Sequence, residues 1–206
     1  MANVNSPFGF RLFSMLSGTI QNVSIRRYRV PAAVTSPIFV GDPVERYPGS
    51  SVMSGTNPSL NQEPGLEYVQ RATGISGDQM LGVVVGVCWN PTNLTSTFSV
   101  GGVDRDIMVC DDPNAIYEIQ SDINGVTPLQ LGNNCLVSGL SNGNPLTGTS
   151  GAVVTGAANN KLYPLLIMGW SQDQNNDITS VPYVRVLVRI NSQQLTMSAG
   201  AGALGV

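Results

Sequence analysis

The chain has 206 residues, of which 42% are hydrophobic and 11% are charged, and its formal net charge is -3. A typical soluble domain carries about 25% charged residues, so this composition predicts a surface that meets other protein. The sequence contains no histidine, which excludes Ser-His-Asp and Cys-His catalysis and nearly all catalytic zinc sites, and its acidic balance gives no electrostatic reason to bind nucleic acid.

Turn-forming residues divide the whole chain into short segments. There are 23 glycines and 13 prolines, together with many Asn, Ser and Thr residues. Turn-forming residues at this frequency oppose long helices and are typical of β proteins. We therefore expect an all-β fold, a jelly-roll-like sandwich or barrel of about ten short strands, with an N-terminal arm and a flexible C-terminal tail. No internal repeat is evident in the sequence.

Residues 1–23 are predicted to form the arm. They are rich in Phe, Leu and Met without a sustained period of 2 or 3.6, so the arm should pack on the body or on a neighbour. Pro7, Gly9 and Arg11 interrupt the apolar run, and a signal peptide is not expected. Four arginines and no acidic residue occur in residues 1–35, which gives this stretch a charge of +4 and leaves -7 for the remainder.

A basic stretch on an acidic body suits an acidic protein partner. The alternative is that the arginines only flank a first strand in solvent.

The body is predicted to span residues 24–197. The segments expected to form strands are 24–30, 37–44, 66–72, 81–89, 94–100, 105–110, 115–120, 135–139, 161–170 and 183–190. The clearest alternation is in the last segment, where Val184, Val186, Val188 and Ile190 share one face. The apolar runs at 83–85 and 165–168 predict strands covered on both faces.

Long Gly/Ser/Asn-rich connections are expected at residues 49–65 and 139–160, and residues 198–206 are predicted to form the flexible tail. The longest apolar run, residues 80–89, is half the ~20 residues that a membrane helix needs. Cys88, Cys110 and Cys135 are odd in number and widely spaced, which favours buried free thiols from a reducing compartment.

Other chemistry is weakly indicated. Acidic residues gather at residues 104–112, where a cation site or a glycosidase-type pair is the alternative to a strand bracketed by acidic turns. Residues 173–177 place oxygen ligands at alternate positions, but Ile178 and Val184 stand where a calcium-binding EF-hand needs glycine and glutamate. The pattern of Gly200, Gly202 and Gly205 lacks the strand and helix that a dinucleotide site requires. No cofactor or metal is expected.

Several landmarks in order along the chain resemble a family of bacteriophage proteins. These are residues 1–3 (MAN) with 7–11 (PFGFR), residues 40–44 (VGDPV), residues 82–87 (GVVVGV), residues 109–113 (VCDDP) with 117–120 (YEIQ), residues 147–151 (TGTSG), and a final strand ending at Asn191. Together they span residues 1–191 and resemble the cement, or head-decoration, proteins of tailed bacteriophages.

The resemblance implies a β-rich virion protein, made in the host cytoplasm, which binds the outer capsid between major capsid protein subunits as a small oligomer. We favour a trimer over a dimer. Aromatic and Arg side chains dominate protein interfaces, so we assign the capsid contact to Phe8, Phe10, Arg11, Arg26, Arg27 and Arg29. The alternative is that Phe8 and Phe10 fill the protein's own interior.

Two rival functions remain at this level. One is another phage structural part, a coat or tail-tube subunit. The other is a carbohydrate-binding or hydrolytic β-sandwich that uses the acids at residues 104–112. An enzyme is not expected.

Overall fold

The protein is described by a computed structural model, which describes residues 3–18, 23–48, 66–89, 95–179 and 182–195. These residues form an all-β fold of two antiparallel sheets. The strands are β1 (Arg11–Met15), β2 (Ile25–Val30), β3 (Pro43–Arg46), β4 (Val69–Arg71), β5 (Gly82–Val87), β6 (Arg105–Cys110), β7 (Ala115–Gln120), β8 (Asn134–Ser138), β9 (Val153–Ala158), β10 (Leu165–Trp170) and β11 (Arg185–Ile190). One 3-10 turn, η1 (Pro128–Gln130), lies between β7 and β8.

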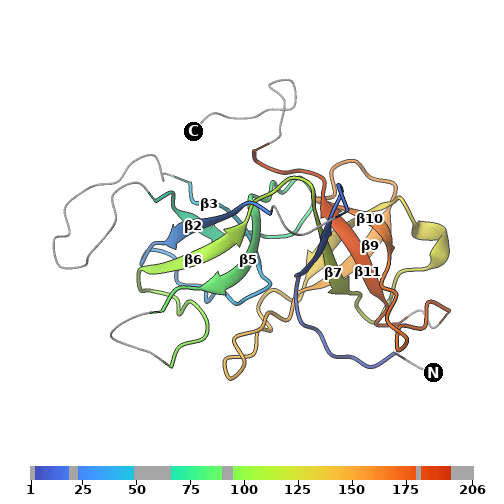
Figure 1. The fold of residues 1–206 in the computed structure, drawn as a ribbon, viewed down its shortest axis with the longest axis horizontal. Helices are drawn as coiled ribbons and strands as arrows, with labels where there is room; N and C mark the ends of the chain where they lie inside the picture. The colour runs from blue at the N-terminus through green and yellow to red at the C-terminus, as the bar shows by residue number, and fades with distance from the viewer. Residues whose placement is uncertain (1–2, 19–22, 49–65, 90–94, 180–181, 196–206) are drawn as a thin grey trace.

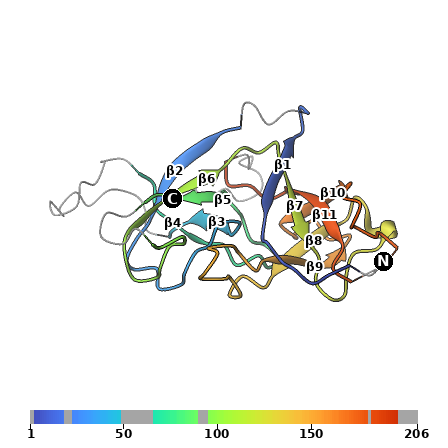
Figure 2. The same ribbon diagram turned by 60° about the horizontal axis from the view of Figure 1, so that its bottom comes forward.

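The two sheets lie side by side (Figure 1). The first has five strands in the order β2-β6-β5-β3-β4, and the second has six in the order β1-β7-β11-β10-β8-β9. Each sheet takes its strands from one half of the chain, except that β1 crosses over to join the second sheet. Figure 2 shows β2 along the rim of the first sheet and β1 against β7 of the second.

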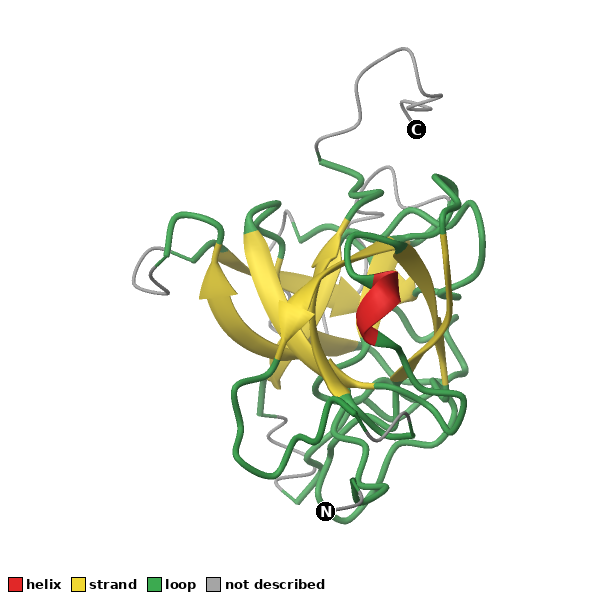
Figure 3. Cartoon of the chain, turned by 90° about the vertical axis from the view of Figure 1, so that its right-hand side faces the viewer, coloured by secondary structure: helices red, strands yellow, loops and turns green. Residues whose placement is uncertain are grey.

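Each sheet curves back on itself and is joined by a parallel bridge. In the second sheet, the residue after β7, Ser121, forms a parallel bridge with Val154 of β9. In the first sheet, Arg29 of β2 forms a parallel bridge with Tyr68, which precedes β4. Figure 3 views the second sheet from its outer end, with its strands curving around an interior. Curvature of this kind leaves fewer open edges than a flat sheet would.

Two hydrophobic clusters form the core. The larger fills the second sheet and includes Tyr117, Ile119 and Leu165, and the smaller packs on the first sheet around Tyr28 and Ile107. Strand β5 contributes to both, because Val83 joins the larger cluster and Val84 the smaller. Successive side chains of a strand point to opposite faces, so β5 is buried from both sides.

Polar contacts also tie the two sheets together. The fully buried Tyr117 of β7 donates its hydroxyl to the carbonyl of Cys110 in β6, at 3.1 Å. After β11, the buried Gln193 amide donates to the carbonyls of Leu81 (3.0 Å) and Asp111 (2.6 Å). Buried donors that lack partners are costly, so these bonds also fix how the sheets meet.

The predicted fold class is confirmed, and most predicted strands lie where the sequence placed them. The alternation in β11 is confirmed, since Val184, Val186, Val188 and Ile190 are all buried. The run at 83–85 is buried from both sides as predicted. The run at 165–168 is only partly so, because Met168 is exposed. Cys110 and Cys135 are buried free thiols, whereas Cys88 is half-buried.

Several boundaries were wrong. Residues 95–100 form no strand, only a single bridge between Ser99 and Ile38, and β3 begins at Pro43 rather than at residue 37. The expected connection at 139–160 contains β9, whose small residues Thr155, Gly156 and Ala157 hide its strand character. The connection at 49–65 and the tail at 198–206 lie outside the described residues.

The N-terminal arm also needs correction, because β1 lies within it. Residues 11–15 pair antiparallel with β7, so this segment belongs to the body. A register shift between Leu12 and Ser14 marks a bulge at Phe13. That bulge explains why the sequence shows no clean period of 2.

Candidate partner-binding surface

Phe10 faces the interior of the protein. Its side chain is only 4% exposed, and its ring meets that of Tyr117 edge to face with centroids 5.9 Å apart. The Phe10 amide donates to the carbonyl of Gly41 at 2.9 Å. The structure therefore removes Phe10 from the predicted contact, in favour of the alternative in which it fills the protein's own core.

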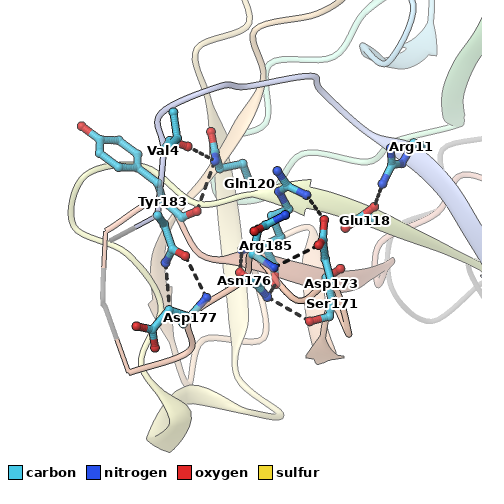
Figure 4. Close-up of polar contacts among 12 residues, drawn as sticks. Val4, Arg11, Glu118, Gln120, Ser171, Asp173, Asn176, Asp177, Tyr183 and Arg185 are labelled. Atoms are coloured by element: carbon cyan, nitrogen blue, oxygen red, sulfur yellow. Dashed lines mark hydrogen bonds and ion pairs between the residues drawn. The ribbon is translucent and has the colours of Figure 1, made fainter. Parts of the chain in front are cut away.

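Phe8 lies at the surface between two arginines. The guanidinium carbons of Arg11 and Arg185 lie 5.1 and 5.8 Å from the centre of its half-buried ring. Each arginine also pairs with a carboxylate, Arg11 with Glu118 and Arg185 with Asp173 (Figure 4). The hydrogen bond from Asn175 and the charge of Arg185 lower the pKa of the Asp173 carboxyl.

The first residues are held beside this cluster by Gln120 of β7. The Gln120 amide nitrogen donates to the carbonyls of Val4 (2.9 Å) and Tyr183 (3.1 Å), and its oxygen accepts from the amide of Ser6 (Figure 4). Asn3 donates to the carbonyl of Asp177 at 2.9 Å. The start of the chain is thus part of the surface of the second sheet.

The other three predicted arginines lie on β2 and pair with acids of β6 and the residue after it. Arg26 pairs with Asp111, while Arg27 and Arg29 pair with Asp106 at 2.5 and 2.6 Å. Burial alone would raise the pKa of Asp106, but the hydrogen bonds and charges of Arg29 and Arg27 outweigh it and lower that pKa. Each of these three arginines thus has a carboxylate partner within the protein.

These pairs sort the predicted contact residues by accessibility. The Arg29 side chain is buried, whereas those of Arg26 and Arg27 remain 55% and 38% exposed. The structure brings Phe8 together with Arg11 on the second sheet and places Arg26 and Arg27 on the first. Of the six residues, Phe8 and Arg11 thus form one surface group and Arg26 and Arg27 a second. Phe10 and Arg29 are buried.

The acids at 104–112 serve the protein's own contacts. Asp104 accepts from the amide of Ala32, and Asp112 from that of Asn114. Asp111 accepts from Ser24 and from the Tyr28 hydroxyl. Burial, together with this hydrogen bond to Asp111, raises the pKa of Tyr28 well above that of a free phenol. Within the described ranges, no group of three or more acidic or cysteine side chains is placed to hold a metal ion.

A groove that the sequence did not suggest lies between the sheets, with a volume of about 450 Å³. Its lining combines Gln70, Arg71 and Thr73 from the β4 region with the end of β8 and the residues after it. Arg71 donates across it to the carbonyls of Pro37 (3.1 Å) and Leu140 (2.9 Å). These bonds bridge the two sheets, so the arginine has a structural task there.

Two carboxyls lie behind the groove lining. Glu45 accepts from Gln70 at 2.6 Å, and Asp78 accepts from Thr73 at 3.1 Å and from the amide of Gly74 at 2.6 Å. Burial, and the neighbouring Asp78, raise the pKa of Glu45 to about 7. Neither acid lines the groove.

Exposed apolar side chains occur on both sheets. The largest exposures in the described residues include Val4, Phe13, Leu16, Ile25, Ile75, Trp89, Ile123, Leu129, Leu131, Leu146 and Leu162. Scattered exposed residues are ordinary, but here they accompany a low content of charge. Phe13 lies within β1 and Leu16 directly follows it, so both are exposed apolar residues close to Arg11 in the chain.

Comparisons of the chain with protein-family models, with curated proteins and with solved structures gave no match. No helix in the described part of the chain has the length and apolar character needed to cross a membrane.

Proposed function

We propose that this chain is a structural protein of a bacteriophage virion, which binds the outer capsid surface and cements neighbouring major capsid protein subunits. The ordered landmarks along residues 1–191 suggest this role. The observation that carries the proposal is a surface with few charges, on which most arginines pair within the chain while aliphatic and aromatic side chains remain exposed.

Such a surface suits association with a partner. Burying exposed apolar area contributes about 25 cal/mol per Å², and arginines already held by carboxylates lose little further freedom on binding. A ligand that bridges subunits only in the assembled shell stabilises that shell selectively. Many equivalent sites on one shell add avidity.

The proposed contact on the second sheet consists of Phe8, Arg11, Phe13 and Leu16. Phe10 and Arg29 are left out because the protein buries them. Arg26 and Arg27 form a separate surface on the first sheet, and a protein that joins neighbouring subunits needs at least two such surfaces. We propose a trimer as the unit that binds.

Sedimentation with undecorated capsids tests the proposal. The purified protein should pellet with capsids at micromolar concentration and stay in solution without them. Absence of co-sedimentation would overturn the proposed function.

A pair of variants tests the surface. Phe13→Ser should weaken pelleting about tenfold, because Phe13 is an exposed aromatic on the proposed contact. Leu146→Ser, at a position that is 91% exposed and outside the proposed contact, is the matched control and should pellet like the wild type. Equal pelleting of both variants would show that the contact lies elsewhere.

A further inference from the structure

The two halves of the chain repeat one strand order. We name residues 24–110 the first unit and residues 115–190 the second unit. In each unit the first strand pairs with the fifth, the fifth with the fourth, the fourth with the second, and the second with the third. In each, a parallel bridge then returns the third strand to the first.

The equivalence extends to single hydrogen bonds. Gly41 and Gly132 both have positive φ, 91° and 81°, and their amides donate to the carbonyls of Val84 (2.8 Å) and Ile167 (3.1 Å). Val84 and Ile167 are each followed by a register shift that ends at a glycine, Gly86 in one unit and Gly169 in the other. Gly41 therefore corresponds to Gly132, and Val84 to Ile167.

Strand pairing carries this correspondence to the first strands. Val84 pairs with Val109, which pairs with Arg26, and Ile167 pairs with Val188, which pairs with Tyr117. Arg26 of β2 therefore corresponds to Tyr117 of β7. By the same alignment, Ile25 corresponds to Ile116 and Arg27 to Glu118.

The units differ in what lies against these corresponding edges. In the second unit, β1 covers the outer edge of β7, with Arg11 opposite Glu118 and Ser14 opposite Ile116. In the first unit, Tyr68 meets β2 only at Arg29, and no described strand pairs with the outer edge at residues 25–27. This edge lies on the rim of the first sheet (Figure 2), and Ile25 is 43% exposed.

The charge on this edge selects the kind of strand that would fit it. A β1 strand from a second copy would place Arg11 opposite Arg27, and like charges directly opposite each other destabilise a sheet. Arg26 and Arg27 instead favour acidic residues in the positions that Leu12 and Arg11 occupy against β7. Both guanidiniums remain partly exposed while paired with the protein's own carboxylates.

We propose that residues 25–27 of β2 bind an extended acidic segment of a partner protein, added as an antiparallel strand in the place that β1 occupies on β7. Main-chain hydrogen bonds supply the affinity of such an added strand, and the arginines select its charge. The inference stands on the internal equivalence of the two units and does not require a capsid. If the partner is a coat subunit, this edge supplies the second contact of the proposed function.

A peptide derived from β1 is a suitable probe. The test peptide has the sequence of residues 8–17 with Arg11→Glu and Leu12→Glu, and the control peptide has the unaltered sequence. Titrations followed by backbone amide NMR shifts should show the acidic peptide binding at β2, with the control at least about tenfold weaker. Added salt should weaken the acidic peptide, because part of its affinity is electrostatic.

Substitutions at Ile25 separate strand addition from simple charge attraction. The Arg29 amide donates outward, to the carbonyl of Glu67. Amides an even number of residues apart in a strand point to the same side, so the Ile25 amide, four residues before Arg29, also points to the outer edge. Ile25→Pro removes this outward donor without removing a bond to β6, and it should abolish binding. Ile25→Ala keeps the donor and should bind as the wild type does.

Two results would overturn the inference: no binding of the acidic peptide, or equal binding by the proline and alanine variants. Unchanged amide spectra outside β2 check that the proline variant is folded. If the protein pelleted with capsids but did not bind the peptide, the proposed function would stand and this inference would fail.

Discussion

The first and second units have the same strand order, yet the chain completes them differently. The second unit receives a sixth strand, β1, which places Phe10 against Tyr117 and Arg11 against Glu118. In the described part of the chain, the first unit has no strand at the corresponding edge, where Arg26 and Arg27 lie. One strand order thus occurs twice in a single chain, and among the described strands the two copies differ in whether a sixth strand pairs with the edge of the first strand.

The largest expected effect comes from removing the anchor of β1. Phe10→Ala leaves a cavity beside Tyr117 and should lower the free energy of unfolding by about 3–5 kcal/mol, measured by urea denaturation. Phe13→Ala, on the same strand but exposed, should cost much less. A loss below about 1 kcal/mol for Phe10→Ala would mean that β1 contributes little to the second unit.

The corresponding glycines of the two units test how far the equivalence holds. A Cβ on Gly41 would lie 3.1 Å from the Phe10 amide nitrogen and from the Phe8 carbonyl oxygen, whereas a Cβ on Gly132 meets nothing within 4 Å. Both have positive φ, so Gly132→Ala should cost about 1 kcal/mol and Gly41→Ala about 2–4 kcal/mol. Equal losses in urea denaturation would contradict the role of the N-terminal segment.

A charge difference at the next position gives a pH test. Asp42 corresponds to Asn133, because Val84 donates to the carbonyl of Asp42 (2.9 Å) as Ile167 does to that of Asn133 (3.0 Å). Burial raises the pKa of Asp42 to about 6 from 3.8, against the hydrogen bonds that it accepts. The folded state therefore binds this proton more tightly than the unfolded state does.

The favourable contribution of Asp42 is complete below its unfolded pKa and is lost as the pH rises through about 6. Between pH 4.5 and pH 7.5 this loss amounts to about 2 kcal/mol, and Asp42→Asn should remove it, so that stability falls less over this range. Glu45, whose pKa burial raises to about 7, keeps part of the slope in the variant. An identical slope for both proteins, from urea denaturation at each pH, would contradict the assignment.

The smallest effect is expected at the bulge glycines. A Cβ on Gly86 or Gly169 would lie 3.9 Å from Met108 or Leu187 respectively, an ordinary contact. Gly86→Ala and Gly169→Ala should each change the free energy of unfolding by less than about 1 kcal/mol, and by similar amounts. A large loss in only one variant would show that the two bulges are not equivalent.

The sequence was sufficient to predict the fold class and the strongly patterned strands. Alternation in β11 and the apolar run in β5 are local signals that burial enforces. The bulge at Phe13 and the small residues of β9 remove that signal, which is why these two strands were missed. The repeated strand order is also not visible in the sequence, because corresponding residues such as Arg26 and Tyr117 occupy equivalent backbone positions but have different side chains.

The candidate surface was predictable only in part. Arginine content pointed to residues 11, 26, 27 and 29, but their pairing with acids of β6 and β7 depends on contacts between distant parts of the chain. Phe8 and Phe10 look alike in sequence, and only the fold places one outside and the other inside. The groove at Arg71 requires both sheets and leaves no local sign.

The pairing of β1 with β7 has a consequence for biosynthesis. Arg11 is synthesised before its partner Glu118, which follows 107 residues later. Strand β1 therefore cannot pair with β7 until the entire first unit has been translated. During that interval the Leu, Phe and Met side chains of β1 have no partner strand, and charge repulsion between Arg11 and Arg27 would oppose pairing of β1 with residues 25–27 of β2.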